Sequence, residues 1–509
     1  MRYFLFVIFL SLGAHAKISK DDSLRLRQNL KIENIREHQR ALQDIADRHR
    51  GNRMAGTEGY RQSVSYIADR LRNSGYEVRL QDFYLNIAHD QSPPALGIIG
   101  TYQHSFVADV DFSSMSFSGT KEVRGALEAI DLKIPSLKPN DSTSGCESED
   151  FAGFKPGNIA LIQRGSCSFS RKAELAQAAG ASAVIIFNEG SEGRLELISS
   201  RLGQNTANFP VFGASFQVGN SLRGSALRGP TGISVSVKID VVNSAKTIQN
   251  IIAESAQGDS NRVVAVGAHL DSVASGPGIN DNGSGSATIL EIAELYASLS
   301  ITPKNKIRFL WFGAEEFGLV GSEFYVDSLN LAERNRIMAM LNFDMLGSPN
   351  YVRFVYDGDN SGQSEISATA GPQGSALIEK IFLDYFAAQN LVSEPTAFNG
   401  RSDYGPFIKV GIPAGGLFSG AEGKKSNRLA QIYGGQASVA FDPCYHQSCD
   451  NFKGTESPLA LKSLDELSQA AAHAIANLAS TDQEIRPPQT LPIVVPQPVW
   501  DYQGPVLVR

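Results

Sequence analysis

Three apolar runs between residues 263 and 346 constrain the fold more than any other part of the chain. The run VVAVGA precedes His269, IRFLWFG precedes Glu315 and Glu316, and MAMLNF precedes Asp344. Short apolar runs are typical of the buried strands of parallel sheets. If these strands are parallel neighbours, their carboxyl ends meet in the crevice where open α/β sheets bind ligands. The pattern therefore predicts a pocket that contains one imidazole and several carboxylates.

The segment after the first run suits a metal site. His269 and Asp271 are two residues apart at a strand end, so both side chains should point to the same side. We expect His269 to ligate a metal and Asp271 to accept the other ring N–H. Asp281 follows in a Gly/Ser-rich turn that opens a predicted helix over Ser286–Ala297, and its carboxylate could bridge two cations.

The adjacent glutamates should have different roles. Successive side chains at a strand end diverge, so Glu315 and Glu316 should not both bind the same ion. One should ligate a metal, and the other should act as a general base toward water. Asp344 completes the carboxylate set, which is difficult to explain as surface charge because uncompensated buried carboxylates are costly.

A further ligand is needed, because two tetrahedral zinc sites that share one Asp need roughly five protein ligands. His446 is the candidate, since it lies between Cys444 and Cys449. Those cysteines could instead bind zinc together with His446. An exported protein with an even cysteine count favours disulfides, so we predict the pairs Cys444–Cys449 and Cys146–Cys167.

The N-terminus predicts export. Residues 1–16 combine Arg2, an apolar run over Tyr3–Leu12 and the small-x-small pattern Ala14-His15-Ala16, which together resemble a signal peptide. The alternative is an apolar helix packed on a domain. No other segment reaches transmembrane length, so we expect a soluble protein that is secreted or periplasmic. A net charge of −7 without a long basic run argues against a nucleic-acid partner.

Composition divides the rest of the chain. Residues 17–96 read as helices followed by a strand and form the first part of the domain that carries the candidate site. Residues 97–242 are β-rich, with Gly, Ser and Pro between short strands. Residues 243–480 carry the candidate site, and residues 481–509 form a Pro-rich tail. Within the second segment, GNIALIQRGSCSFSRKAELAQAAGASAVIIFNEG resembles a protease-associated domain with its paired cysteines.

The ordered motifs GAHLDSV, NDNGSGS, AEEFGLVGS, NFDMLGS, GRSDYGPF, GIPAGGLFSGAEG and CYHQSCD resemble the secreted double-zinc aminopeptidases. The resemblance includes the aminopeptidase Y or leucine aminopeptidase type, which carries an inserted protease-associated domain, and it covers nearly the whole mature chain. It implies an α/β zinc-peptidase fold with a mixed, mostly parallel central sheet flanked by helices. The β-rich segment would be the inserted domain.

The resemblance also implies site residues and a reaction. It implies two Zn²⁺ sites that share one carboxylate: His269, Asp281 and Asp344 for one ion, and Asp281, Glu316 and His446 for the other. Glu315 matches the general base, Tyr445 the residue that stabilises the oxyanion, and Arg401 a substrate contact. The implied substrates are peptides with a free N-terminus, with a preference for large apolar first residues such as Leu.

Three other functions remain open on the same scaffold. A carboxypeptidase would cleave peptides whose N-terminus is blocked, and a glutaminyl cyclase would bind a single zinc ion. A non-enzymatic, receptor-like relative would lack metal ligands. Retention of the five ligands and of Glu315 speaks against the receptor.

Overall fold

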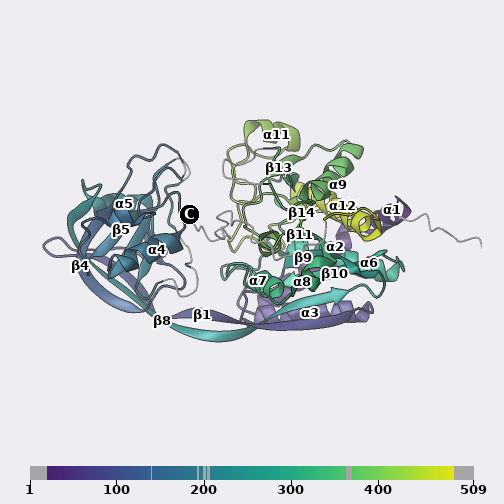
Figure 1. Cartoon of the computed structure of the whole chain (residues 1–509), viewed down its shortest axis with the longest axis horizontal. Coiled ribbons are helices and arrows are strands. Elements are labelled where there is room, and N and C mark those ends of the chain that lie inside the picture. The colour runs from purple at the N-terminus through teal and green to yellow at the C-terminus, as the bar shows by residue number, and fades with distance from the viewer. Residues whose placement is uncertain are drawn as a thin grey trace, which may run out of the picture.

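The computed structural model describes residues 20–138, 140–191, 194–198, 202, 207–362 and 370–486. The predicted signal peptide and most of the predicted Pro-rich tail lie outside these residues. The chain forms a large and a small body, joined by two long strands (Figure 1). We call them the peptidase body and the PA body. Among the described residues, no helix is long and apolar enough to cross a membrane.

The two joining strands belong to both bodies. β1 (Glu77–Ile99) and β8 (Gly229–Glu254) pair antiparallel from Glu77↔Glu254 to Ile99↔Ser234. At one end β8 also pairs with a strand of the peptidase body, and at the other end it pairs with a strand of the PA body. The pair therefore forms one ribbon that runs from one sheet into the other.

The peptidase sheet has the strand order β13-β12-β14-β11-β9-β10-β8. β9 (Asp259–His269) pairs in parallel with β10 (Asn305–Phe312) and with β11 (Ile337–Phe343). β11 is also parallel to β14 (Ala414–Phe418), whereas the short β12 (Phe354–Tyr356) is antiparallel to β14 and parallel to β13 (Glu394–Thr396). The predicted mixed, mostly parallel sheet is confirmed, and its central strands correspond to the three apolar runs.

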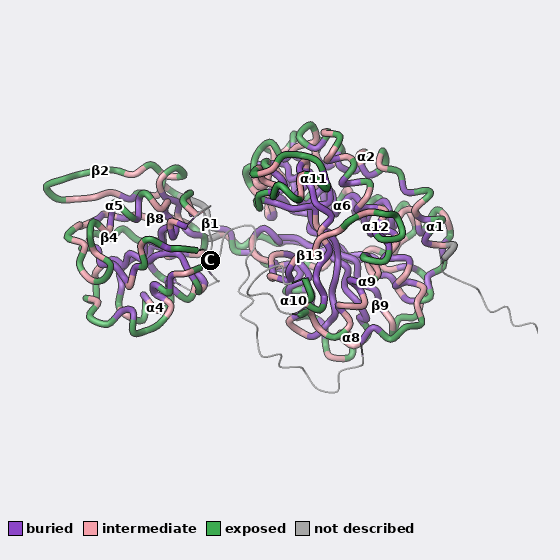
Figure 2. The backbone as a smooth tube through the Cα atoms, turned by 90° about the horizontal axis from the view of Figure 1, so that it is seen from above, coloured by how far each residue is buried: buried purple, intermediate pink, exposed green. Residues whose placement is uncertain are grey.

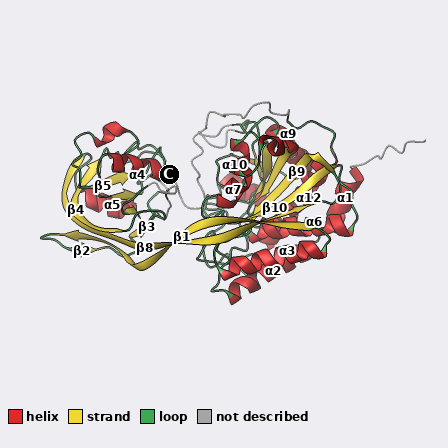
Figure 3. Ribbon diagram, turned by 60° about the horizontal axis from the view of Figure 1, so that its bottom comes forward, coloured by secondary structure: helices red, strands yellow, loops and turns green. Residues whose placement is uncertain are grey.

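Helices cover both faces of this sheet (Figure 3). Successive side chains of β9 point to opposite faces of the sheet. Val264 and Val266 therefore contribute to one core cluster, while Val263 and Ala265 contribute to another. The larger cluster contains residues of α1 (Lys20–Asn29), α2 (Ile32–Arg48), α3 (Glu58–Asn73), α6 (Gly283–Ser298), α9 (Ser375–Ala388) and α12 (Pro458–Ser480). The other contains residues of α7 (Val320–Asp327) and α10 (Tyr404–Lys409), beside the short helix α8 (Leu331–Arg336). Tyr433 of α11 (Asn427–Tyr433) belongs to a small separate cluster.

Helix α6 lies at the centre of the larger cluster. It is buried from Gly283 to Ala293, because α2 and α3 pack on the side away from the sheet. The helix starts three residues earlier than the predicted Ser286, since the Asn282 side chain accepts a hydrogen bond from the Gly285 N–H and caps it. The first turn of α6 is thereby placed at the carboxyl end of β11.

The PA body has its own sheet, in the order β8-β4-β5-β6-β7-β3. Its strands are β3 (Phe112–Ser114), β4 (Lys121–Ile130), β5 (Ile159–Gln163), β6 (Ala183–Phe187) and β7 (Val211–Ala214), with β2 (His104–Ser105) paired to β1. Helices α4 (Phe169–Ala178) and α5 (Phe216–Arg223) pack on it, and a 3₁₀ turn spans Ser148–Phe151. Figure 2 shows buried backbone in each body, which agrees with separate core clusters.

Because α6 is buried, its side chains should contribute measurably to the free energy of unfolding. Leu290 on this helix is fully buried, whereas Leu383 on α9 is 40% exposed. We expect Leu290→Ala to lower the free energy of unfolding by about 2–5 kcal/mol, because it leaves a cavity in a close-packed core. Leu383→Ala should lower it by less than about 1 kcal/mol. Urea unfolding followed by circular dichroism tests this, and equal effects of the two substitutions would contradict it.

Candidate active site

The carboxyl ends of β9, β10 and β11 place most of the predicted site residues. His269 is the last residue of β9, Glu315 and Glu316 follow the end of β10, and Asp344 follows β11. Asp281 comes from the turn before α6, whose first residues pack against the end of β11. His446 comes from the distant loop between α11 and α12. The structure brings these six residues together in one site.

Asp281 lies between the two histidines. Its Oδ1 is 3.2 Å from His269 Nε2, and its Oδ2 is 3.1 Å from His446 Nε2. Asp344 Oδ1 lies 3.3 Å from His269 Nε2, and Glu316 Oε2 lies 3.3 Å from His446 Nε2. Two groups of three side chains therefore share the Asp281 carboxylate.

The donor atoms of these groups fit divalent cations. Within the described residues, both oxygens of Glu316, Oδ1 of Asp344 and Nε2 of His446 are buried without a hydrogen-bond partner. Buried polar atoms in native proteins are almost always paired, so such a concentration needs another partner. Imidazole nitrogens and carboxylate oxygens are the ligands that Zn²⁺ binds in proteins.

The charges of the site lead to the same conclusion. Burial raises the pKa of Glu316 to about 7 and raises the pKa of Glu315 well above its usual range. Burial also acts to raise the pKa of Asp281, but the two adjacent imidazoles of His269 and His446 outweigh it and lower that pKa. Several buried carboxylates thus face two imidazoles, and cations would compensate the remaining negative charge.

Asp271 supports the site through two contacts. Its backbone oxygen is 3.1 Å from His269 Nδ1, while its carboxylate Oδ1 is 3.7 Å from the same nitrogen. The carboxylate accepts hydrogen bonds from the backbone N–H groups of Glu315 (3.1 Å) and Glu316 (3.3 Å). Asp271 therefore positions the ring of His269 and the backbone of both glutamates.

A pocket opens over this group. It is lined on the polar side by Glu315, Arg401 and Tyr445, beside the predicted ligands Asp281 and Asp344. Its other lining residues are less polar: Met345, Tyr356, Thr396, Ala397, Asn399, Ser402, Phe418 and Ala421. The pocket thus combines a charged floor with an apolar side.

Tyr445 and Arg401 are linked at the rim of the pocket. Arg401 Nη2 donates to the Tyr445 hydroxyl at 3.4 Å, and Arg401 Nη1 donates to Glu422 Oε1 at 2.6 Å. The Tyr445 ring stacks on His446, with ring centroids 3.8 Å apart. The two residues therefore have fixed positions beside Glu315.

Both predicted disulfides are present. Cys444 and Cys449 close the loop that carries Tyr445 and His446, and Cys146 pairs with Cys167 in the PA body. Because the first bond joins residues only five apart, it restricts the conformations of the loop that carries His446.

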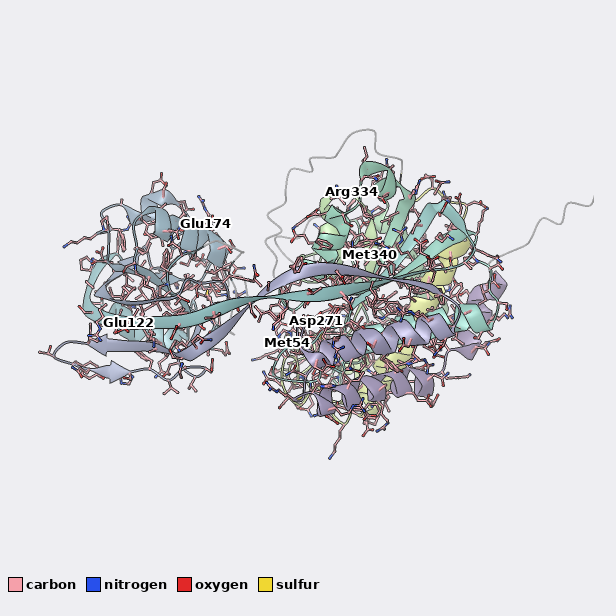
Figure 4. The ribbon with its side chains drawn as sticks, turned by 90° about the horizontal axis from the view of Figure 1, so that it is seen from below. Met54, Glu122, Glu174, Asp271, Arg334 and Met340 are labelled. Carbon is pink, nitrogen blue, oxygen red and sulfur yellow. A yellow bond between two sulfur atoms is a disulfide. The ribbon has the colours of Figure 1, made fainter. Side chains whose placement is uncertain are left out.

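Sequence reasoning missed the residues that hold the turn before Asp281. Arg53, which is fully buried, donates to the backbone oxygens of Leu270, Pro277 (2.8 Å) and Gly278 (2.7 Å). Figure 4 shows the neighbouring residue Met54 close to Asp271. In the sequence Arg53 belongs to a polar turn before a helix, which usually indicates only a cap, although such a turn could also line a cleft.

A buried carboxylate holds the same turn from the other side. Asp450 accepts hydrogen bonds from the backbone N–H groups of Asn280 (2.7 Å) and Asp281 (3.0 Å).

Ser402 donates from Oγ to Asp344 Oδ2 at 2.5 Å. Asp450 ends the quoted motif CYHQSCD and Ser402 lies in GRSDYGPF, so both lie in recognised motifs without any sign of these roles.

Each of the two bodies contains a region that matches a known protein family. Residues 250–473 match the sequence model of peptidase family M28, and residues 132–222 match that of the PA domain. In structure, the chain is similar to the aminopeptidase from Aneurinibacillus sp. strain AM-1 (TM-score 0.68, 24% identity, 91% of this chain and 98% of that one). It is also similar to BSAP, a zinc aminopeptidase from Bacillus subtilis (TM-score 0.62, 25% identity, 90% and 99%).

Curated relatives are more similar in sequence. An aminopeptidase of Pseudomonas aeruginosa is 44% identical over 429 residues, which cover 84% of this chain and 78% of the relative. A probable leucine aminopeptidase 2 of Aspergillus oryzae is 37% identical over 94% of this chain and 90% of its own length. The chain belongs to peptidase family M28.

Proposed function

We propose that this chain, an aminopeptidase of family M28, is an exported two-zinc enzyme that removes large apolar residues such as Leu from peptide N-termini. The observation that carries the proposal is the Asp281 carboxylate between His269 and His446, with one oxygen toward each ring. The two disulfides support an oxidising compartment outside the cytoplasm.

The proposed metal ligands form two sets that share Asp281. His269, Asp281 and Asp344 would hold one Zn²⁺, and Asp281, Glu316 and His446 would hold the other. Bound zinc supplies a water of lowered pKa and polarises the scissile carbonyl. Asp271 and Ser402 orient His269 and Asp344 through the contacts described above.

Glu315 is the proposed general base. Its carboxylate lines the pocket, and burial raises its pKa well above the ordinary range. It takes the proton of the attacking water and then passes that proton to the leaving amine, so it ends the cycle ionised as it began. Asp271, which accepts from the Glu315 N–H, keeps the base in place.

Tyr445 and Arg401 act on the carbonyl side of the pocket. The Tyr445 hydroxyl donates a hydrogen bond to the oxygen on which negative charge develops. Arg401 contacts the same hydroxyl and holds it toward the substrate. The Tyr445 hydroxyl can therefore donate to the transition state while Glu315 keeps its position.

The shape of the pocket supports the substrate preference. A protonated α-amino group binds beside the carboxylates of the floor, which favours N-termini over internal bonds. Met345, Tyr356 and Phe418 line the apolar side, where burial of a leucine side chain is favourable. An acidic or lysine side chain would lose hydration there without a matching partner.

We also propose domain boundaries. Residues 1–16 form the signal peptide, residues 17–96 and 243–480 form the peptidase domain, residues 97–242 form the inserted PA domain, and residues 481–509 form the tail. The boundaries at 97 and 242 fall within the paired strands β1 and β8, which run through both bodies.

A matched substrate pair tests the activity. We expect hydrolysis of Leu-p-nitroanilide and no hydrolysis of its N-acetylated form, because the free amino group is bound by the carboxylates. EDTA should abolish activity and Zn²⁺ should restore it. The release of p-nitroaniline measures both. Equal turnover of the free and acetylated substrates would contradict the aminopeptidase assignment, and the rates for Leu-, Gly- and Glu-p-nitroanilide would test the preference.

The two glutamates form a matched pair of variants. We expect Glu315→Gln to keep the zinc content of the unchanged enzyme and to lower kcat by about 10²–10⁴-fold, as for loss of a general base. Glu316→Gln should lose zinc, because it removes a ligand. Elemental analysis of the purified variants, together with kcat, distinguishes the roles. Metal loss in Glu315→Gln alone would show that the roles are exchanged.

A further inference from the structure

The contact between Arg401 and Tyr445 has a third member, Glu422. Arg401 Nη1 donates to Glu422 Oε1 at 2.6 Å, and Arg401 Nη2 donates to the Tyr445 hydroxyl at 3.4 Å. Arg401 and Tyr445 line the pocket, whereas Glu422 is not among its lining residues. The Glu422 side chain is 48% exposed. One guanidinium thus joins a carboxylate outside the pocket to a hydroxyl inside it.

The chemistry of the guanidinium determines the direction of the hydrogen bond to Tyr445. An arginine side chain has N–H donors and no acceptor, so the Tyr445 oxygen can only accept from Arg401. The hydroxyl hydrogen of Tyr445 is not used in this contact and stays available to an oxygen in the pocket. The positive charge beside the hydroxyl also strengthens its donation to an oxygen that gains negative charge.

Glu422 is the stronger of these two partners of Arg401. The contact with Tyr445 is longer than most N–H···O hydrogen bonds, whereas the contact with Glu422 is short. A hydrogen bond between two charged groups is roughly twice as strong as one between neutral groups. Partial burial acts to raise the pKa of Glu422, but the charge of Arg401 and the hydrogen bond from it outweigh burial and lower that pKa. The ionised Glu422 therefore holds the flexible arginine side chain in place.

The backbone that carries Glu422 is itself bound to the segment that leads to Tyr445. Two backbone hydrogen bonds of 2.8 Å lie on either side of Glu422, from the Asp442 N–H to the Ala421 oxygen and from the Phe441 N–H to the Gly423 oxygen. The donors come directly before the disulfide loop that carries Tyr445. Glu422, Arg401 and Tyr445 thus close a ring of contacts, in which the backbone fixes the position of the carboxylate relative to the hydroxyl.

We propose that Glu422 is a positioning residue of the reaction, which holds Arg401 against the Tyr445 hydroxyl and so directs that hydroxyl toward the oxygen of the scissile carbonyl. The inference rests on the proposed function, in which Tyr445 stabilises the oxyanion, and adds a residue outside the pocket to it. The carbonyl oxygen gains its negative charge only in the transition state, so Glu422 should affect kcat and leave KM unchanged.

The kinetics of Leu-p-nitroanilide hydrolysis test this role. We expect Glu422→Gln to lower kcat about 10-fold, to change KM by less than about 2-fold, and to keep the zinc content of the unchanged enzyme. Tyr445→Phe should lower kcat by about 10²–10³-fold, as for loss of an oxyanion donor. In the Tyr445→Phe background, Glu422→Gln should change kcat by less than about 2-fold, because no hydroxyl remains for it to position.

The chain offers a matched control with the same order of carboxylate, guanidinium and hydroxyl. Glu254 of β8 accepts from Arg308 Nε of β10 at 2.6 Å, and Arg308 Nη1 donates to the Tyr325 hydroxyl of α7 at 2.7 Å. The Glu254 side chain is 37% exposed, and the lining of the pocket includes none of these three residues. Glu254→Gln should leave kcat and KM within about 2-fold of the unchanged enzyme.

Arg401→Lys is a second variant for the case that Glu422→Gln does not fold. A lysine has one compact ammonium instead of a planar fork, so it cannot reach Glu422 and Tyr445 in the same way. We expect it to lower kcat when Tyr445 is present and to have less than about a 2-fold effect on kcat in the Tyr445→Phe background. Circular dichroism and elemental analysis establish that each variant is folded and holds its zinc.

The outcomes are separable. A similar loss of kcat from Glu422→Gln in both backgrounds would overturn the inference, because Glu422 would then act independently of Tyr445. An unchanged kcat, a rise in KM alone, or a loss of zinc in Glu422→Gln would overturn it as well. In each of these cases cleavage of Leu-p-nitroanilide by the unchanged enzyme would leave the proposed aminopeptidase function standing.

Two further results bear on the proposed function itself. Full kcat in Tyr445→Phe would remove Tyr445 from the proposed mechanism, and the inference about Glu422 with it. Failure of the unchanged enzyme to cleave any leucyl substrate would overturn the proposed function as a whole.

Discussion

The contact of one carboxylate with two imidazoles determines the geometry of the site. Asp281 contacts His269, which ends β9, and His446, which lies in a loop more than 150 residues further along the chain. Asp344 and Glu316 then each approach one of the two histidines. Because the three carboxylates are buried, their negative charge must be compensated within the site, and the fold supplies the ligand types that divalent cations require.

Much of the surrounding structure holds the turn that carries Asp281. Arg53 binds three backbone oxygens of the segment between residues 270 and 278, and Asp450 binds two N–H groups at its end. The turn is thus held by an N-terminal segment on one side and by a segment near the Cys444–Cys449 loop on the other. Parts of the chain distant in sequence thereby contribute to one ligand position.

The sequence was most informative where chemistry and burial coincide. Apolar runs ending at His269, Glu315 and Asp344 could be interpreted as strands that meet at one edge, and the central strands confirm this. Arg53 could not be found in this way, because its partners are backbone oxygens, which leave no residue pattern. The same holds for the carboxylate of Asp271, whose partners are the N–H groups of Glu315 and Glu316. The joining strands were also missed, since a strand shared by two sheets has the same local pattern as two separate strands.

The shared ribbon of β1 and β8 determines how the two bodies can move. A loop hinge would allow rotation about single bonds, but here two hydrogen-bonded strands form the connection, so a change of angle requires the ribbon itself to bend or twist. Its pairing is irregular between Asp90 and Ala95, on either side of Pro93 and Pro94, which cannot donate to a ladder. Bending of the ribbon should therefore concentrate at residues 90–95, which lie where β8 begins to pair with β4 of the PA body.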